Sequence, residues 1–253
     1  MAGSYEYHPG GRLLAGVLAF LGLHIVLLTV GFGSSAMQLS LLQRAAQGEE
    51  ITQEEADSND QREMAIGSVV LAEFLFLAIL FLSALSRANA NAHALGAEGL
   101  TYTPGWTVAW FFIPIANLFK PYLTVRETWR ASDPAHLDWR QNHLPKLLPI
   151  WWTLWLVSSV LDRVTTAYSR SAESVSELTG LTIMTMASGF VAIVLSVVAA
   201  TLLYRLYALQ ERRRQLVDQS RFSCVNCGEP LDAEVKVCAV CGMPAGAPAG
   251  LAT

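Results

Sequence analysis

Four apolar stretches, each long enough to cross a lipid bilayer, restrict this chain more than any other feature of its sequence. They cover residues 13–32, 65–85, 147–164 and 181–204, and a helix needs about 17 to 25 apolar residues to span the hydrocarbon core. Composition agrees, since 53% of the residues are hydrophobic and 15% are charged, whereas soluble domains carry about 25% charged residues. The sequence therefore predicts an all-α integral membrane protein with four transmembrane helices.

The first apolar stretch also has a second interpretation, as a cleaved signal peptide. Ser34, Ser35 and Ala36 are small residues of the kind found at a processing site. A transmembrane helix is favoured, because the apolar run is longer than that of a typical signal peptide and Glu6 lies where basic residues are expected.

An acidic region over residues 33–63 separates the first two apolar stretches. Thr52 and Glu55 have the spacing of a capping box, which predicts the start of the helix that leads into the second stretch. A calcium site is the alternative for the carboxylates, but their spacing does not match an EF-hand loop. A solvated helix face is the favoured interpretation.

An aromatic segment, defined here as residues 106–119, follows the second apolar stretch. It is nearly all apolar but too short to cross a bilayer as a helix, and Pro114 removes a helical hydrogen-bond donor near its middle. The sequence favours a re-entrant or surface-lying position at the membrane over a fifth crossing.

An amphipathic helix is predicted directly after the aromatic segment. Tyr122, Val125 and Trp129 recur at helical spacing beside Arg126 and Arg130, a pattern typical of a helix at the lipid interface. Packing on the rest of the protein is the alternative. The residues predicted to form this membrane-interface motif are Trp106, Trp110, Pro114, Asn117, Pro121, Tyr122 and Trp129.

The placement of basic residues predicts the orientation of the chain. With four crossings, one side of the membrane carries only Arg44, Arg62, Arg163 and Arg170. The rest of the 17 lysines and arginines lie on the other side. The positive-inside rule then places both termini in the cytoplasm. A fifth crossing would move the N-terminus but would leave the C-terminal tail cytoplasmic.

All four cysteines lie in this tail, as two Cys-x2-Cys pairs separated by ten residues. Four thiolates from such pairs, Cys224, Cys227, Cys238 and Cys241, form a tetrahedral zinc site. Gly228 and Gly242 each follow the second cysteine of a pair, where a tight turn favours positive φ. The tail resembles the small zinc-ribbon modules at the ends of many bacterial membrane proteins.

Paired disulfides and a dithiol redox couple are the alternatives to zinc. A reducing cytoplasm favours structural zinc, and a module this small has almost no core, so we expect it to be unfolded without metal. Its own charges are slightly acidic, with Glu229, Asp232 and Glu234 against Lys236. We therefore expect a protein partner or self-association through the ribbon, and no nucleic acid. The basic run at residues 212–214 suits anionic headgroups.

Two ionisable residues lie deep in the predicted spans. His24 and Glu73 are at nearly the same depth on the first two helices, which run in opposite directions. A carboxylate within a membrane is costly unless it is neutral or paired, so the sequence predicts a hydrogen bond between them. The pair either joins two helices or contributes to a proton or ion pathway, and the structural role is favoured.

The motif residues of the aromatic segment carry a resemblance to a known family. The resemblance lies in the run WFFIPIAN over residues 110–117, in Pro121 with Tyr122, in residues 87–90 and in the pair Trp151 and Trp152. In these features the sequence resembles the bacterial membrane family called domain of unknown function 4328. The resemblance covers Leu13 to Arg205 and implies an architecture but no activity.

These observations predict a protein of five parts, listed by residue: a short N-terminal segment (1–12), a four-helix membrane domain (13–210), a basic linker (211–221), a zinc ribbon (222–243) and a disordered tail (244–253). We expect a multi-pass protein of the bacterial plasma membrane, non-enzymatic, with the ribbon as a cytoplasmic docking module. The alternative is a small transporter or channel component that uses His24 and Glu73. An intramembrane enzyme is disfavoured, since no nucleophile and base are paired at membrane depth.

Overall fold

A computed structural model describes residues 5–136, 138–221, 224, 226–229 and 237–243. Every regular element within these ranges is a helix, which confirms the all-α prediction for the described residues. The elements are α1 (Gly11–Ala46), α2 (Gln53–Ala94), α3 (Pro104–Ala109), η1 (Ala116–Leu118), α4 (Lys120–Ser132), η2 (Trp139–Gln141), α5 (Leu147–Ser169) and α6 (Val175–Arg221).

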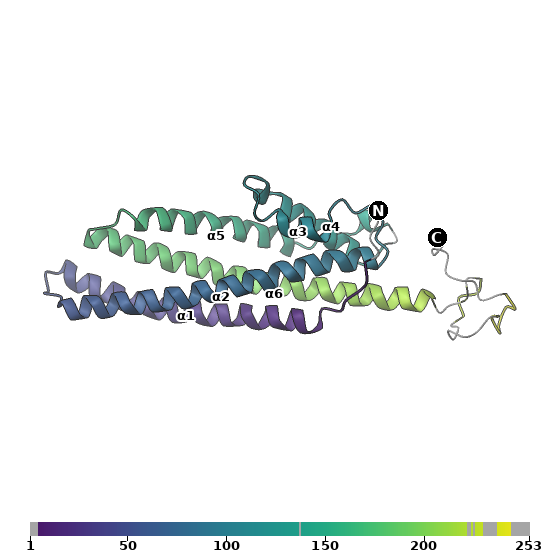
Figure 1. Ribbon diagram of the computed structural model, residues 1–253, viewed down its shortest axis with the longest axis horizontal. Coiled ribbons are helices and arrows are strands. Elements are labelled where there is room, and N and C mark those ends of the chain that lie inside the picture. The colour runs from purple at the N-terminus through teal and green to yellow at the C-terminus, as the bar shows by residue number, and fades with distance from the viewer. Residues whose placement is uncertain (1–4, 137, 222–223, 225, 230–236, 244–253) are drawn as a thin grey trace.

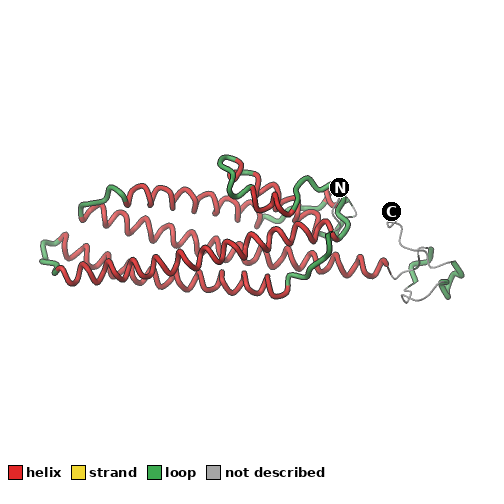
Figure 2. Tube along the Cα trace, in the orientation of Figure 1, coloured by secondary structure: helices red, strands yellow, loops and turns green. Residues whose placement is uncertain are grey.

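The four long helices lie side by side in an elongated bundle (Figure 1). α6 packs against both α1 and α5, and α1 also packs against α2. The short helices α3 and α4 lie against the side of the bundle near one end, where α2 contacts both of them. α6 continues past this end of the bundle toward the C-terminus (Figure 2).

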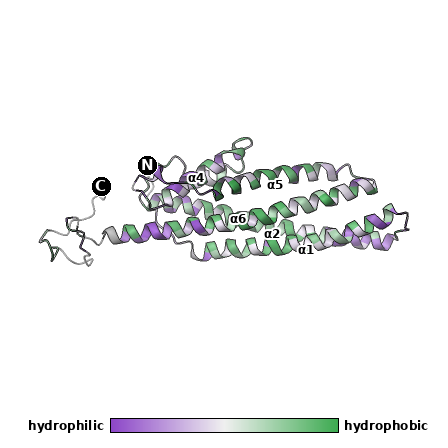
Figure 3. Ribbon diagram, turned by 180° about the vertical axis from the view of Figure 1, so that it is seen from behind, coloured by the Kyte–Doolittle hydropathy of each residue, from purple (hydrophilic) through white to green (hydrophobic). Residues whose placement is uncertain are grey.

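Three helices are long and apolar enough to cross a membrane, namely α1, α2 and α6. Only 17%, 11% and 28% of their respective most apolar stretches are buried inside the protein. Figure 3 shows that apolar residues occupy the middle of the bundle and polar residues its ends. Apolar helix surface that the protein itself does not cover requires a lipid environment, so this is a membrane protein.

α5 covers the third predicted span but is not among these three helices. It contains Trp151, Trp152 and Trp155, which prefer the membrane interface to the hydrocarbon core, and Asp162 and Arg163 lie near its far end. These residues lower the hydropathy of the most apolar stretch of α5 below that of the corresponding stretches of α1, α2 and α6.

α1 runs as one helix through the small residues that suggested a processing site. Ser34 and Ser35 are both buried within it. Ser34 Oγ lies 2.5 Å from Glu63 Oε1 and accepts a hydrogen bond from Arg62 Nε at 2.8 Å. These polar contacts link α1 to α2.

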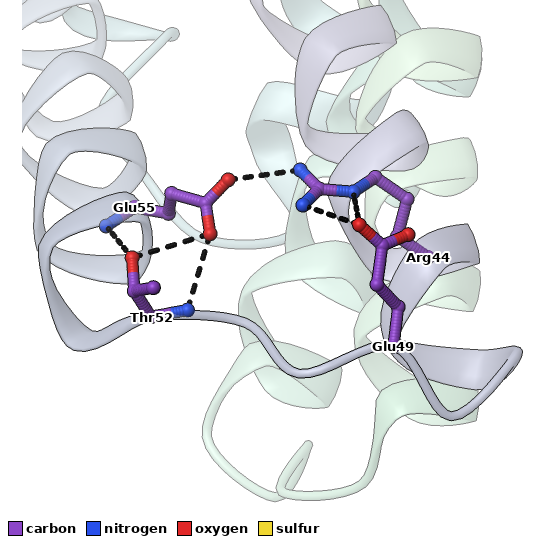
Figure 4. Close-up of polar contacts among 4 residues, drawn as sticks. All are labelled: Arg44, Glu49, Thr52 and Glu55. Atoms are coloured by element: carbon purple, nitrogen blue, oxygen red, sulfur yellow. Dashed lines mark hydrogen bonds and ion pairs between the residues drawn. The ribbon is translucent and has the colours of Figure 1, made fainter.

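A polar cluster closes the turn between α1 and α2 (Figure 4). Thr52 and Glu55 form the predicted capping box, in which each side chain accepts a hydrogen bond from the other residue's backbone N–H. Arg44 donates to Glu49 at 2.8 Å and to Glu55 at 3.0 Å. Arg44 thus forms ion pairs with two carboxylates of the acidic turn. No group of carboxylates in the described residues is arranged to hold a metal.

This cluster makes stability at the turn depend on pH. The Arg44 guanidinium lowers the pKa of both Glu49 and Glu55. A carboxyl group whose pKa is lowered on folding stabilises the fold above its unfolded pKa of about 4.3, and this contribution is lost as pH falls through the lower, folded pKa.

We expect the R44Q variant to unfold at a slightly lower temperature than the native protein at pH 7 and at the same temperature near pH 3. The expected difference is small because all three side chains are exposed to solvent. Thermal unfolding followed by circular dichroism at both values of pH measures it. A larger difference at pH 3 than at pH 7 contradicts the assignment.

Candidate functional site

The four tail cysteines form the densest cluster of metal-binding side chains in the described residues. The sulfur atoms of Cys224, Cys227, Cys238 and Cys241 all lie within 4.8 Å of one another, and all four are free thiols. The nearest contacts join different pairs, at 3.4 Å between Cys224 and Cys241 and 3.6 Å between Cys227 and Cys238. A zinc–sulfur bond of about 2.3 Å in a tetrahedron implies a sulfur–sulfur separation of about 3.8 Å.

Two similar turns hold these sulfur atoms. In the first, the Cys224 N–H donates to the Glu229 carbonyl at 2.8 Å and the Gly228 N–H to the Cys224 carbonyl at 2.9 Å. The second repeats both bonds, from Cys238 to Met243 and from Gly242 to Cys238, at the same distances. The glycines have φ of 74° and 69°, which confirms the predicted positive φ. The residues between the turns lie outside the described part of the chain.

Electrostatics at the cluster favour a bound cation. The backbone N–H of Met243 lowers the pKa of the Cys241 thiol to about 6. The backbone N–H of Glu229 also lowers that of Cys227, but desolvation and the three neighbouring sulfur atoms outweigh it and raise the pKa of Cys227 to about 12. Four close thiols cannot all ionise by themselves, and a metal ion removes this conflict because it deprotonates its thiol ligands. The cluster therefore could hold a metal ion.

The structure brings His24 of α1 and Glu73 of α2 together. His24 Nδ1 lies 2.5 Å from Glu73 Oε2, and both side chains are buried. Glu73 Oε1 has no hydrogen-bond partner among the described residues. The contact gives each of these two buried polar groups a partner that the surrounding apolar side chains and lipid do not provide. The contact fixes the register of α1 against α2.

The aromatic segment folds as a broken turn beside the bundle. α3 ends at Ala109, and η1 begins at Ala116 after a turn in which the Asn117 N–H donates to the Ile113 carbonyl. Ile115 has φ of 67° and ψ of −49°, in a tight turn in which the Ala116 N–H donates to the Pro114 carbonyl at 2.8 Å. Such a conformation costs a β-branched residue about 1–3 kcal/mol. No continuous helix of spanning length exists here, which rules out a fifth helical crossing.

Contacts with α5 determine where this turn lies. Trp152 Nε1 donates to the Leu118 carbonyl at 3.2 Å, and the rings of Phe111 and Trp155 pack edge to face with centroids 6.1 Å apart. Trp106 stacks on Trp110 with centroids 4.5 Å apart. Of the pair noted in the sequence as a family feature, Trp152 thus holds the aromatic segment, whereas Trp151 packs on Phe81 in the core.

The remaining residues of the membrane-interface motif divide between surface and core. Trp106 and Pro114 are exposed, Trp110, Asn117 and Tyr122 are partly buried, and Pro121 and Trp129 are buried. Val125 and Trp129 join the main hydrophobic core together with Trp151. α4 is therefore packed on its own protein, and Trp129 does not lie at the lipid interface. The sequence pattern did not distinguish these positions, because a buried helix and an interfacial helix show the same apolar spacing.

A buried polar network at the same end of the bundle was not predicted. Gln210 of α6 donates to the Ala88 carbonyl at 2.6 Å and to Ser132 Oγ of α4 at 2.9 Å. Asn91 of α2 donates to Gln210 and exchanges hydrogen bonds with the backbone of His8. The network joins the N-terminal segment, α2, α4 and α6. The alternation of alanine with asparagine over residues 88–92 was the available signal, since small residues permit the close helix contact that buries the amides.

Comparison with known proteins identifies one family. A family model described as domain of unknown function 4328 matches residues 47–208. The match includes α2 and the aromatic segment but neither α1 nor the cysteine cluster, so it begins later than the Leu13 expected from the sequence. No curated protein and no solved structure matches the chain.

Proposed function

We propose, since this chain belongs to the family described as domain of unknown function 4328, that it is a multi-pass membrane protein whose zinc-binding tail is a docking module. The observation that carries the proposal is α6, one continuous helix that leads from the apolar bundle to the cysteine cluster. A metal-stabilised module on a helical extension presents a surface to other proteins or to a second copy of the chain.

Zinc is the metal we propose. Four cysteine ligands and no other type of donor favour a soft tetrahedral site, which zinc fits better than magnesium or calcium. With all four positions filled by protein, such a site is structural, because catalytic zinc keeps one position open. The described cysteines thus support a folding role for the metal.

We propose that α5 is a fourth crossing helix. Its 23 residues rise about 35 Å, which exceeds the roughly 30 Å hydrocarbon core. It packs against α6, and it exposes Val157, Val160 and Val164 to the outside of the bundle. Four crossings place both chain ends on the side that is rich in lysine and arginine, which we assign to the cytoplasmic face of a bacterial plasma membrane.

We also propose that the protein is not an enzyme. The buried pair of His24 and Glu73 joins a histidine to a carboxylate and not to a hydroxyl or thiol nucleophile. The acidic residues near the cysteines similarly favour a protein partner over nucleic acid.

The docking role is tested by comparing the full chain with a chain that ends at Arg221. Two differently tagged copies are expressed together, crosslinked in membranes and analysed for the second copy and for other proteins. We expect the crosslinked species to need the tail and the membrane domain to insert without it. If the shortened chain yields the same crosslinked species, the tail is not the docking module.

A transporter or channel role for His24 and Glu73 is the second candidate. Glu73 Oε1 is buried without a partner in the described residues, which leaves one oxygen available to a proton or cation. Proton and cation flux into vesicles that contain the native protein or E73Q tests this role. Flux that is absent from the native protein, or equal in both proteins, eliminates it.

A further inference from the structure

The aromatic segment presents apolar side chains away from the protein. Phe112 and Ile115 are 71% and 75% exposed, and Ile113, Leu118 and Phe119 are also exposed. Ile115 is exposed although its backbone has a strained positive φ of 67°. Five large apolar side chains on one short turn form a surface that water does not favour.

Contacts with α5 give the depth of this turn in the membrane, an argument that rests on the proposed crossing by α5. Trp152 and Trp155, which hold Leu118 and Phe111, lie five and eight residues after Leu147. At 1.5 Å per residue these positions are about 8 and 12 Å along the helix. One leaflet contributes about 15 Å of hydrocarbon, so the turn lies within a single leaflet.

A lysine lies directly after the apolar turn. Lys120 Nζ is 5.3 Å from the ring centroid of Trp110, 5.7 Å from that of Tyr102 and 5.8 Å from that of Phe119. These rings attract the ammonium group on one side. Among the residues that the structure describes, no carboxylate lies within ion-pair distance of Lys120.

The two ends of the bundle differ in how many basic residues lack an ion pair. At the end that carries the turn between α1 and α2, Arg44 and Arg62 have carboxylate partners, whereas Arg163 and Arg170 have none among the described residues. At the opposite end, Arg140 and Arg214 are paired as well. At the end that carries Lys120, the described part of the chain provides no ion pair to a further group of basic residues: Arg12, Arg87, Arg126, Arg130, Lys146, Arg205 and Arg212. Positive charge at this end is left for an anionic partner.

We propose that the aromatic segment inserts into the cytoplasmic leaflet and that Lys120, positioned by Tyr102, Trp110 and Phe119, binds the phosphate of an anionic phospholipid. The apolar turn contacts the acyl chains of the same leaflet. The rings hold the ammonium group at the level where headgroup phosphates lie, and the remaining ammonium protons are available to the phosphate oxygens. The site selects a lipid by charge and by depth.

Native mass spectrometry of the full chain, released from equal mixtures of phosphatidylglycerol and phosphatidylethanolamine, tests the site. We expect K120Q to retain about fivefold less phosphatidylglycerol than the native protein and K120R to retain nearly as much. K146Q is the matched control, because Lys146 lies at the same end, is exposed and contacts no ring in the described residues. Equal retention by K120Q and the native protein, or an equal loss in K146Q, overturns the proposal.

Two further measurements separate the lipid from other occupants. Benzoylphenylalanine in place of Phe112 is expected to crosslink to phospholipid in membranes, and crosslinking to protein alone overturns insertion into the leaflet. Inorganic phosphate is expected not to displace the bound lipid, and displacement at millimolar concentration identifies a site for free phosphate instead. A chain that inserts, binds zinc and crosslinks through its tail but shows no effect of K120Q retains the proposed function and loses this site.

Discussion

Replacing Cys238 with serine is expected to reduce zinc bound to the purified full-length protein from about one ion per chain to nearly none. Structural zinc in small modules contributes about 10–16 kcal/mol of apparent binding energy, and a structural site is not complete without all four of its protein ligands. Cys238 is buried, and its backbone N–H closes the second turn of the cluster. Zinc content after dialysis against a mild chelator measures the effect.

The matched control for this substitution is V237S. It introduces the same side chain at the neighbouring position, which is 54% exposed and provides no sulfur ligand. We expect V237S to keep its zinc and C238S to become sensitive to protease in the tail while the membrane domain remains intact. Zinc retained by C238S at the native level, or tail structure that survives complete removal of metal, contradicts a structural zinc site.

Replacing His24 with leucine is expected to destabilise the membrane domain by about 3 kcal/mol. The substitution leaves the Glu73 carboxyl group buried between α1 and α2 without its partner, and removing one member of a buried pair costs about 3–5 kcal/mol. E73Q is expected to cost less, about 1 kcal/mol, because an amide donates a hydrogen bond to the histidine. Unfolding by a denaturing detergent in mixed micelles measures both values.

Two controls distinguish the loss of the contact between His24 and Glu73 from a general loss of packing. L23A changes an exposed neighbour on α1, so its effect is expected to stay within about 0.5 kcal/mol. The double variant H24L/E73L is expected to be more stable than the sum of its single substitutions predicts, because it leaves no unpartnered polar group. Strict additivity of the two substitutions rules out the coupling between His24 and Glu73.

Features that depend on local sequence could be predicted. Apolar length located α1, α2 and α6, because a helix in lipid satisfies its own backbone hydrogen bonds and needs little else from its neighbours. The capping box at Thr52 and the positive φ of Gly228 and Gly242 follow from spacing within a few residues. Equal depth on antiparallel helices was enough to suggest the contact between His24 and Glu73.

Features that depend on distant parts of the chain could not be predicted. The burial of Trp129 results from the packing of α4 against α2, α5 and α6, and the same apolar spacing suits an interfacial helix. The bonds of Gln210 reach Ala88 and Ser132, which lie 122 and 78 residues away in the sequence. The positive φ of Ile115 is unusual for a β-branched residue, so no sequence rule indicated it.

The continuity of α6 has a mechanical consequence. The 17 residues from Arg205 to Arg221 extend the helix by about 26 Å beyond its apolar part. Gln210 ties the first half of this extension to α2 and α4, so the helix leaves the bundle as a stiff rod with a fixed direction. Because each residue turns a helix by about 100°, adding or deleting a single residue after Gln210 turns the end of the rod to a different side of the protein.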